Sequence, residues 1–331
     1  MNDVKFGVDL STLVRGNDYD KLAHETLECE KLGYYSAWIE DHFFSGTLAG
    51  GTVPLFECWT SLSFLAAVTR TIRLGTLVLS NSYRIPSLLA KMAATFDFMS
   101  NGRLEFGFGA GWKEDEYEAY GIPYPSTRVR IAQMKEAVTI IKKMWTEDRP
   151  TFQGKYYHIN DARCDPKPIQ QPHPPIWIGG VGERFLLRAV AEHADGWNIF
   201  MPEVEGLKAC EHKLAVLKKH CYAIGRDPKE IEKSARIDLV IAKTANQVRK
   251  KLKKITSNIW TNVLVDGTWK PQRISTEEYM KRSIVGTPEE CVEKIHKFSE
   301  LGFTYFILGQ IAYRKEEREL FADEVMSNIS C

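Results

Sequence analysis

The sequence lacks the features that would place the protein in or on a membrane or on nucleic acid. No apolar run approaches the roughly 20 residues needed to cross a bilayer, and residues 1–5 show no basic region leading into an apolar block, so we expect no signal peptide. Lys and Arg number 44 against 43 Asp and Glu, which gives a net charge of +1. This balance provides no overall field for nucleic acid or a membrane surface, and neither is expected as a partner.

Paired and clustered cysteines are also missing. The chain has seven cysteines, an odd number, and they form no CxxC pair. Their irregular spacing predicts reduced thiols and a cytoplasmic location. No cluster of Cys, His, Asp or Glu has the spacing of metal ligands, so we expect no metal site.

Several catalytic and nucleotide-binding motifs are absent. No GxGxxG follows the first β-rich run, and no GxxxxGK[ST] occurs, which argues against a dinucleotide fold or a P-loop. The sequence contains neither GxSxG nor a Ser-His-Asp order, so nucleophilic hydrolysis has no support.

What the chain does contain is a regular alternation of strand and helix patterns. Its 331 residues are 44% hydrophobic and 26% charged, as in globular proteins. Each of eight β-rich runs is followed by a helical segment; the runs are 5–10, 35–39, 73–79, 103–109, 176–178, 196–200, 235–242 and 303–308. This pattern predicts a closed (β/α)8 TIM barrel. An open doubly wound sheet is the rival, but the absence of a composition break favours one closed domain, 1–331.

Two longer segments interrupt the alternation, at about 146–175 and 256–286, after the fourth and seventh strands. We expect both on the C-terminal face of the barrel, where they could cover a site. The first should hold a small hairpin and an extended loop. The second should be irregular, with a short helix near Glu277. Aromatic residues suggest a partly apolar lid: Tyr156, Tyr157, Trp260 and Trp269.

Ionisable residues follow the second strand directly, at Glu40, Asp41 and His42. In a parallel barrel, strand C-terminal ends are where chemistry is placed. His42 has a pKa range suited to proton transfer, although a lone histidine is often an ordinary buried polar residue. Asp41 could orient the imidazole or bond the barrel rim. Glu116 could be a site carboxylate or a structural charge.

Glycines gather at the ends of the fourth and fifth strands. Gly107, Gly109 and Gly111 alternate, which would clear one face for a flat ring or for close packing of a helix. The fifth strand ends in Gly179, Gly180, Val181 and Gly182 before a helix. That arrangement could bind a phosphate through backbone N–H groups, helped by Arg184 and Arg188, or could be only a tight turn.

Several motifs occur in a fixed order along most of the chain, and together they resemble the bacterial luciferase-like superfamily, in particular its coenzyme F420-dependent oxidoreductases. They are Trp38-x-x-Asp41-His42, Leu74-Gly75-Thr76, Lys91-x-x-Ala94-Thr95-x-Asp97, Asn101-Gly102-Arg103-Leu104, Gly107-x-Gly109-Ala110-Gly111-Trp112, Ile178-Gly179-Gly180 and Ala194-Asp195-Gly196-Trp197-Asn198.

The resemblance implies a barrel that holds a flat deazaflavin at its C-terminal mouth, and hydride transfer between this cofactor and a small organic substrate. His42, after Asp41, would lie near the reacting carbon. From the residues themselves, rather than from the resemblance, we expect Asp41 and Glu116 as further catalytic residues. The family's non-prolyl cis peptide would be Leu77–Val78. The cofactor-binding residues implied are Asp41, His42, Leu77, Val78, Ser80, Gly107, Gly109, Gly111, Gly179, Gly180, Val181 and Gly182.

Two positions depart from family members that oxidise a sugar phosphate or a secondary alcohol. Gly46 stands where those members have a tryptophan, and Trp112 where they have a glutamate. Glu40 or Glu116 could take over the role of that glutamate. The substrate therefore does not follow from the resemblance.

Two other functions stay open: an FMN-dependent monooxygenase that uses reduced FMN and oxygen, and a non-catalytic flavin- or deazaflavin-binding protein.

Helices 56–69 and 86–99 are rich in Leu, Ala and Met. They could form the interface of a homodimer.

Overall fold

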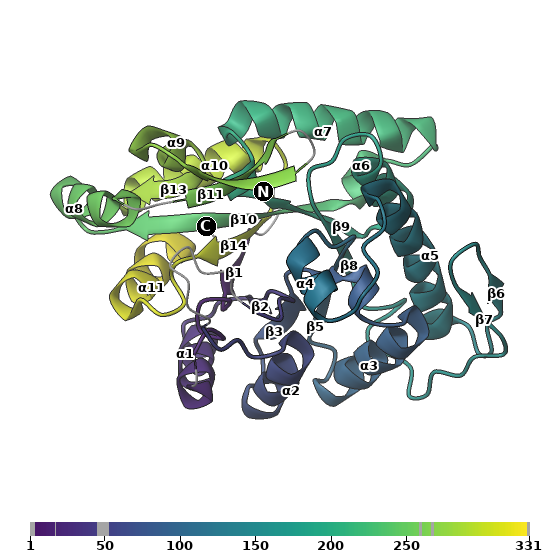
Figure 1. Ribbon diagram of the computed structural model, residues 1–331. Coiled ribbons are helices and arrows are strands. Elements are labelled where there is room, and N and C mark those ends of the chain that lie inside the picture. Colours follow the sequence, from purple (N-terminus) through teal and green to yellow (C-terminus); the bar gives the residue numbers. More distant parts are fainter. Residues whose placement is uncertain (1–3, 17, 45–52, 258–259, 266–267, 330–331) are drawn as a thin grey trace.

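The computed structural model describes residues 4–16, 18–44, 53–257, 260–265 and 268–329 (Figure 1). Within this part of the chain, eight parallel strands pair around a closed ring, so the predicted barrel is confirmed. In ring order they are β1 (Lys5–Asp9), β2 (Ser36–Ile39), β3 (Arg73–Thr76), β5 (Leu104–Gly109), β8 (Ile176–Gly179), β9 (Gly196–Phe200), β10 (Glu232–Ile241) and β14 (Tyr305–Gly309).

Helices surround this ring (Figure 1). They are α1 (Tyr19–Lys31), α2 (Cys58–Val68), α3 (Pro86–Met99), α4 (Glu114–Ala119), α5 (Thr127–Thr146), α6 (Leu186–His193), α7 (Gly206–Ala223), α8 (Ala245–Thr256), α9 (Thr276–Lys281), α10 (Pro288–Glu300), α11 (Lys315–Phe321) and α12 (Ser327–Ile329). No helix in the described ranges combines the length and apolar character that crossing a bilayer requires.

The helix boundaries follow local signals in the sequence. Asp18 accepts a hydrogen bond from the first turn of α1, and Gly33 follows that helix with a φ of 80°. Pro86 opens α3, where its missing N–H has no intrahelical partner to lose. Thr287 and Glu290 form a reciprocal capping box at the start of α10, as the sequence predicts.

Large aromatic side chains fill the interior of the barrel. Trp38 and Trp177 meet edge to face at 6.3 Å, and both contact the buried ring of Tyr305. A Cβ at Gly75 would collide with the Trp38 indole, and one at Gly196 with that of Trp177. These glycines therefore make room for the tryptophans, which close the barrel below its C-terminal mouth.

The third predicted strand, 73–79, is interrupted. It divides into β3 and a short β4 (Leu79–Ser80), and the peptide between Leu77 and Val78 is cis, as the family resemblance implies. β4 pairs with the end of β5, so the strand continues beyond the interruption.

The segment 146–175 does not cover the barrel mouth, and the prediction for its position is wrong. It follows α5, so it leads from a helix end toward the N-terminal end of β8. Its hairpin, β6 (Phe152–Gln153) and β7 (His158–Ile159), is held to α5 by Glu136, which accepts backbone N–H groups of 155–157. Gln170 then bonds Asp97 at the C-terminal end of α3. The segment thus lies outside the helical layer (Figure 1).

The segment 256–286 is more regular than predicted. It contains the hairpin β11 (Trp260–Val265) and β12 (Thr268–Arg273), helix α9, and strand β13 (Ser283–Gly286), which pairs with β10. Arg282 donates to the carbonyl of Pro202, just beyond the C-terminal end of β9. This segment therefore does lie on the mouth side. The side chains of Trp260 and Trp269 fall outside the described ones, so their proposed role in a lid stays a prediction.

The described cysteines are all buried, and none of them is in a disulfide. Burial raises the pKa of Cys29, Cys210 and Cys291 to about 12. A raised pKa keeps these thiols protonated, and the protonated form is unreactive. The three side chains therefore act as small apolar groups in the core. Cys331 lies outside the described residues.

Candidate active site

A histidine and a carboxylate meet at the C-terminal end of β2. His42 Nδ1 lies 3.0 Å from Glu116 Oε2, and the Glu116 side chain is fully buried. Glu116 belongs to α4, which follows β5, so two βα loops bring the pair together. A carboxylate can only accept, so Nδ1 carries the proton and Nε2 is the remaining ring nitrogen.

Glu116 is held from several directions. Tyr83 Oη donates to Oε2 at 2.7 Å, while Lys113 Nζ lies 3.1 Å from Oε1. The backbone N–H groups of Phe43 and Phe44 also donate to Oε1, at 2.9 and 3.3 Å. Burial alone would raise the pKa of Glu116, but His42, Tyr83 and Lys113 outweigh it and lower that pKa to about 2. Glu116 is therefore a fixed negative charge beside His42.

His42 itself is poised to carry a proton. Burial would lower its pKa, but the hydrogen bond to Glu116 and the charges of Glu40 and Glu116 outweigh this and raise the His42 pKa. Burial and the nearby charge of Asp9 raise the pKa of Glu40 in turn. The Trp112 ring meets the imidazole edge to face at 5.7 Å. Trp112 thus contacts His42 with its ring. The carboxylate beside His42 belongs to Glu116, four residues further along the chain.

Asp41 turns away from the imidazole. Both of its oxygens accept from Arg84, at 2.8 and 2.9 Å, and Oδ2 also accepts from the Ser80 backbone N–H at 3.0 Å. Arg84 bonds Glu57 as well. Of the two predicted roles for Asp41, the described contacts match the one at the barrel rim.

The cis peptide forms a platform in the barrel wall. The Leu77 side chain points inward to the cluster of Trp38 and Trp177. The Val78 side chain points into the wall, because a Cβ on Gly109 would lie 2.8 Å from Val78 Cγ2, and one on Gly179 would lie 3.0 Å from both of its methyl groups. With both side chains directed away, the backbone of this peptide is the part left to face the mouth.

The alternating glycines Gly107 and Gly109 were predicted to leave one face of their strand free. Atoms of Thr76 and Val78 lie against that face. A Cβ on Gly107 would collide with the Thr76 carbonyl, and Thr76 Oγ1 donates to the Gly107 carbonyl at 2.7 Å. The glycines accommodate the interrupted strand rather than a neighbouring helix. Gly111 has a φ of 75°, and a Cβ there would collide with the Tyr117 hydroxyl, which is 2.8 Å from Ser80 Oγ.

The glycine loop after β8 has only part of its backbone free. The Gly180 N–H donates to the Asn198 carbonyl at 3.1 Å, and the Gly180 carbonyl accepts from Trp197 Nε1 at 2.8 Å. The N–H groups of Val181 and Gly182 have no acceptor in the described part of the chain. These two, just before α6, are the ones that can bind an anion.

A second polar cluster lies on β10, which is opposite β3 in the ring. Arg236 donates to Asp9 at 2.9 Å and to Asp238 at 2.6 Å, and its guanidinium lies 4.9 Å from the centre of the Phe200 ring. Tyr279 Oη, from the second inserted segment, donates to Asp238 at 3.1 Å. Burial would lower the pKa of Arg236, but the charges of Asp238 and Asp9 raise it. The Arg236 guanidinium is thus a buried cation held between two carboxylates.

Sequence reasoning found His42 and Glu116 but missed the groups that hold them. Tyr83 and Arg84 stand at a strand end, which is a signal, but nothing in the sequence joins them to Glu116 and Asp41. The Arg236 cluster was missed because its members come from different strands. Gly46 lies outside the described residues. No group of three or more possible metal ligands occurs among the described residues.

The described site places a histidine–carboxylate pair at the C-terminal mouth of a parallel barrel, which is where enzymes of this fold carry their catalytic residues. Residues 4–305 match the model of the luciferase-like monooxygenase family. The protein belongs to that family, whose members include F420- and FMN-dependent oxidoreductases.

The relatives differ in the cofactor on which they depend. An F420-dependent glucose-6-phosphate dehydrogenase of Kineococcus radiotolerans is 30% identical over 303 residues, 87% of this chain and 86% of its own. An FMNH(2)-dependent dimethylsulfone monooxygenase of Pseudomonas putida is 25% identical over 90% of this chain and 84% of its own. The solved coenzyme F420-dependent tetrahydromethanopterin reductase of Methanopyrus kandleri has the same fold, with a TM-score of 0.79 and 20% identity over 99% of both chains.

Proposed function

We propose that the protein is a coenzyme F420-dependent oxidoreductase that acts on a small organic substrate. The observation that carries this proposal is the His42–Glu116 pair at the C-terminal mouth of the barrel. Support comes from the relatives, since the 30% identical Kineococcus protein is F420-dependent. When bound, the deazaflavin supplies a carbon that accepts or donates a hydride.

The described residues fit such a cofactor. The backbone of Leu77 and Val78 provides a platform without protruding side chains, as the direction of both side chains indicates. The N–H groups of Val181 and Gly182 would bind the phosphate, with the start of α6 adding its dipole. Asp41 would act indirectly, by fixing the backbone of Ser80 next to the platform.

The role of His42 follows from its hydrogen bonds. Because Glu116 holds Nδ1–H, the Nε2 atom is the one that can exchange a proton with the substrate. In its neutral form it accepts the proton of an alcohol that is being oxidised, and in its protonated form it donates to a carbonyl that is being reduced. Glu116 keeps the ring in the correct tautomer and stabilises the imidazolium, so it is a positioning residue.

The experiment compares cofactors first and activity second. Titration of the purified protein with F420 and with FMN should show binding of F420 by the change in its fluorescence. Tight binding of FMN with no response to F420 would instead favour the FMN-dependent monooxygenase, which the Pseudomonas relative supports.

Replacing His42 by Ala then tests catalysis. We expect turnover of F420 with an active substrate to fall by roughly 10²- to 10⁴-fold, while F420 binding persists. Full activity of H42A would exclude the proton-transfer role. If the wild-type protein binds the cofactor but turns over no substrate in a broad screen, the non-catalytic binding function is favoured.

We further propose that the protein forms a homodimer through α3. Exposed large apolar side chains lie at the start and end of this helix: Ile85, Leu88, Phe98 and Met99 are each more than half exposed. By contrast, α2, the other helix expected at the interface, contributes no large exposed apolar side chain within the described residues. An apolar surface of this kind is typical of contact with a partner.

A further inference from the structure

Glu203 is the last residue of a short 3₁₀ turn, η2 (Met201–Glu203), which follows β9 directly. It therefore stands at the C-terminal end of a barrel strand, which is the edge where this fold places its binding groups. Strands β10 and β11 both lie next to η2, and Glu203 is only partly exposed. None of the roles assigned above uses this carboxylate.

The Glu203 carboxylate has no hydrogen bond and no ion pair with any residue that the structure describes. Its oxygens are not sealed inside the protein, so a ligand can reach them. Burial raises the pKa of Glu203 to about 7, and no charge within the described ranges counteracts this. A largely desolvated carboxylate without a counter-charge is costly to the fold, which points to a use outside it.

Two arginines lie close to η2, but other groups bind both of them. Arg282 donates to the carbonyl of Pro202, and its second terminal nitrogen lies 3.6 Å from the carboxylate of Glu205. Arg236, which is opposite Phe200 in the strand register, is held by the two aspartates described above. Neither arginine therefore neutralises Glu203.

The other carboxylates at the mouth that are not exposed have ion pairs. The pairs are Asp9 and Asp238 with Arg236, Glu40 with Arg15, Asp41 with Arg84, Glu116 with His42 and Lys113, and Glu183 with Lys213. Among these described residues of the mouth, Glu203 is thus the carboxylate that lacks a partner of opposite charge.

Glu203 and His42 lie on opposite sides of the mouth. In the closed ring, β3, β5 and β8 separate β2 from β9 in one direction, and β10, β14 and β1 separate them in the other. A substrate whose reacting group lies at His42 and whose chain crosses the mouth therefore brings its far end to Glu203.

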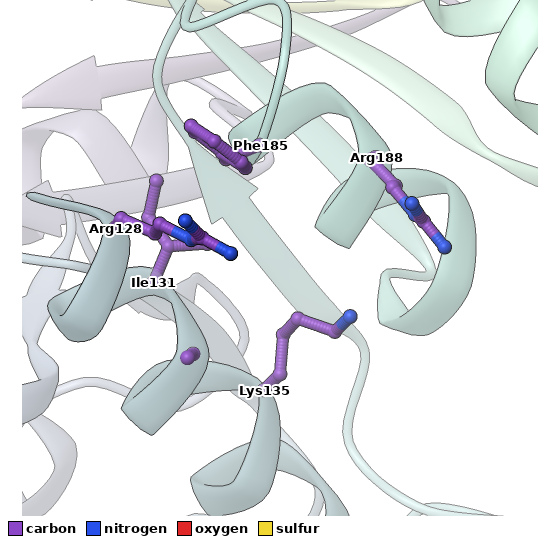
Figure 2. Close-up of a pocket in the computed structure, with 6 residues that line it drawn as sticks. Arg128, Ile131, Lys135, Phe185 and Arg188 are labelled. Carbon is purple, nitrogen blue, oxygen red and sulfur yellow. The ribbon is translucent and has the colours of Figure 1, made fainter.

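A cavity of about 270 Å³ between α5 and α6 takes no part in this site (Figure 2). No residue of β9 or η2 lines it, and its charged side chains are positive: Arg128, Lys135 and Arg188. The unpaired negative charge at the mouth is therefore a separate feature, and the ligand that it attracts is a cation.

We infer that Glu203 binds a positively charged nitrogen of the substrate, so that the protein acts on an organic ammonium compound whose alcohol or carbonyl group lies at His42. The inference deepens the proposed function and rests on it, since it takes the reacting group to be the one that exchanges a proton with His42. An ammonium group fits because it donates hydrogen bonds and supplies the missing charge. A metal ion fits poorly, since no group of three or more possible ligands occurs among the described residues.

The first test measures the charge preference of the site without turnover. Calorimetric titration compares butylammonium, butanol and butanoate on the F420-saturated protein and on the protein alone, for the wild-type protein, E203Q and E205Q. Glu205 is an exposed carboxylate two residues further along the chain, and it provides the matched control. Because E203Q removes a charge that has no partner, we expect this variant to fold.

We expect the wild-type protein to bind butylammonium more tightly than butanol, and butanoate most weakly. E203Q should lose roughly ten- to hundredfold of the butylammonium affinity and should bind butanol as the wild-type protein does, whereas E205Q should match the wild-type protein. The butylammonium affinity should fall as pH drops below about 7, where Glu203 takes up a proton, and E203Q should lack this dependence.

The second test uses secondary alcohols of equal chain length that end in an ammonium or in a methyl group. With F420 as the cofactor, E203Q should raise KM for the ammonium series by a similar factor, with little change in kcat. It should leave KM for the methyl series unchanged. Turnover of the methyl series alone would contradict the inference.

Three binding results would overturn the inference: equal wild-type affinity for butylammonium and butanol, a preference that E203Q retains, or a preference that E205Q loses to the same extent. No response of the protein to F420 would overturn the proposed function instead. The titrations on the protein alone would still judge Glu203, so the two failures are distinguishable.

Discussion

His42 and Glu116 are 74 residues apart in the chain, yet Nδ1 of the histidine lies 3.0 Å from a carboxylate oxygen of the glutamate. The glutamate is fully buried and also accepts from Tyr83 and Lys113. The contact joins the loop after β2 to the helix after β5. It gives the barrel mouth a histidine whose tautomer is set by Glu116 and whose pKa is raised by Glu116 and Glu40.

The His42–Glu116 contact predicts a specific pH dependence. Alcohol oxidation needs neutral His42, so its rate should rise with pH through the raised pKa of the wild-type imidazole. In E116Q the negative charge is gone, the His42 pKa falls, and the midpoint of the profile of kcat/KM should move to lower pH by about one unit. In the reducing direction, where protonated His42 donates, activity should be lost as pH rises through the same midpoint.

The control is E114Q, an exposed glutamate in the first turn of the same helix, which should leave the midpoint unchanged. An identical pH profile for E116Q and the wild-type protein would mean that Glu116 does not set the charge of His42.

The space around two glycines predicts different changes in stability when each is replaced by alanine. In G109A the added methyl would lie 2.8 Å from Val78 Cγ2, so we expect unfolding free energy to fall by about 1–3 kcal/mol. In G182A the nearest atom, Leu186 Cβ, is 3.5 Å away, and stability should change by less than about 0.5 kcal/mol. Chemical denaturation of both variants without cofactor measures this, and equal stabilities would contradict the packing of Val78 against Gly109.

The Asp41–Arg84 pair predicts a strong coupling in stability. Both side chains are largely buried, and the contact is bidentate. R84M leaves the Asp41 carboxylate without its counter-charge and should cost about 3–5 kcal/mol. The double variant D41N/R84M should be less damaged than the sum of the single changes, as a double-mutant cycle measures. Strict additivity would show that the two side chains act independently.

The exposed apolar side chains of α3 predict a change in oligomeric state. If this helix forms the homodimer interface, L88E should shift the protein toward monomer in size-exclusion chromatography with light scattering. Y222E replaces a still more exposed large side chain, on α7, and should leave the assembly intact. A monomeric wild-type protein, or a dimer that L88E leaves unchanged, would contradict the proposal.

Local patterns predicted most of the fold. Alternating strand and helix signals identified every strand of the closed ring, and single residues such as Pro86 and Thr287 marked helix starts. The segment 256–286 was misjudged although its hairpin strands, β11 and β12, have six residues each, which is an ordinary length for a strand. Asp266-Gly267 between them is a dipeptide typical of hairpin turns and was a usable signal. The position of 146–175 was misjudged because it follows a helix rather than a strand.

The sequence by itself determined the barrel and the position of His42 at a strand end, whereas the Leu77–Val78 cis peptide was implied by the family resemblance. Only the tertiary structure decided which carboxylate serves His42. In the folded chain Asp41 binds Arg84, and Glu116 binds the imidazole of His42, although Asp41 is the residue next to His42 in the sequence. The tertiary structure likewise joined Arg236 to Asp9 across β10 and β1. Such pairings depend on the directions of side chains from strands and loops that meet only when the ring closes, and spacing along the chain does not encode them.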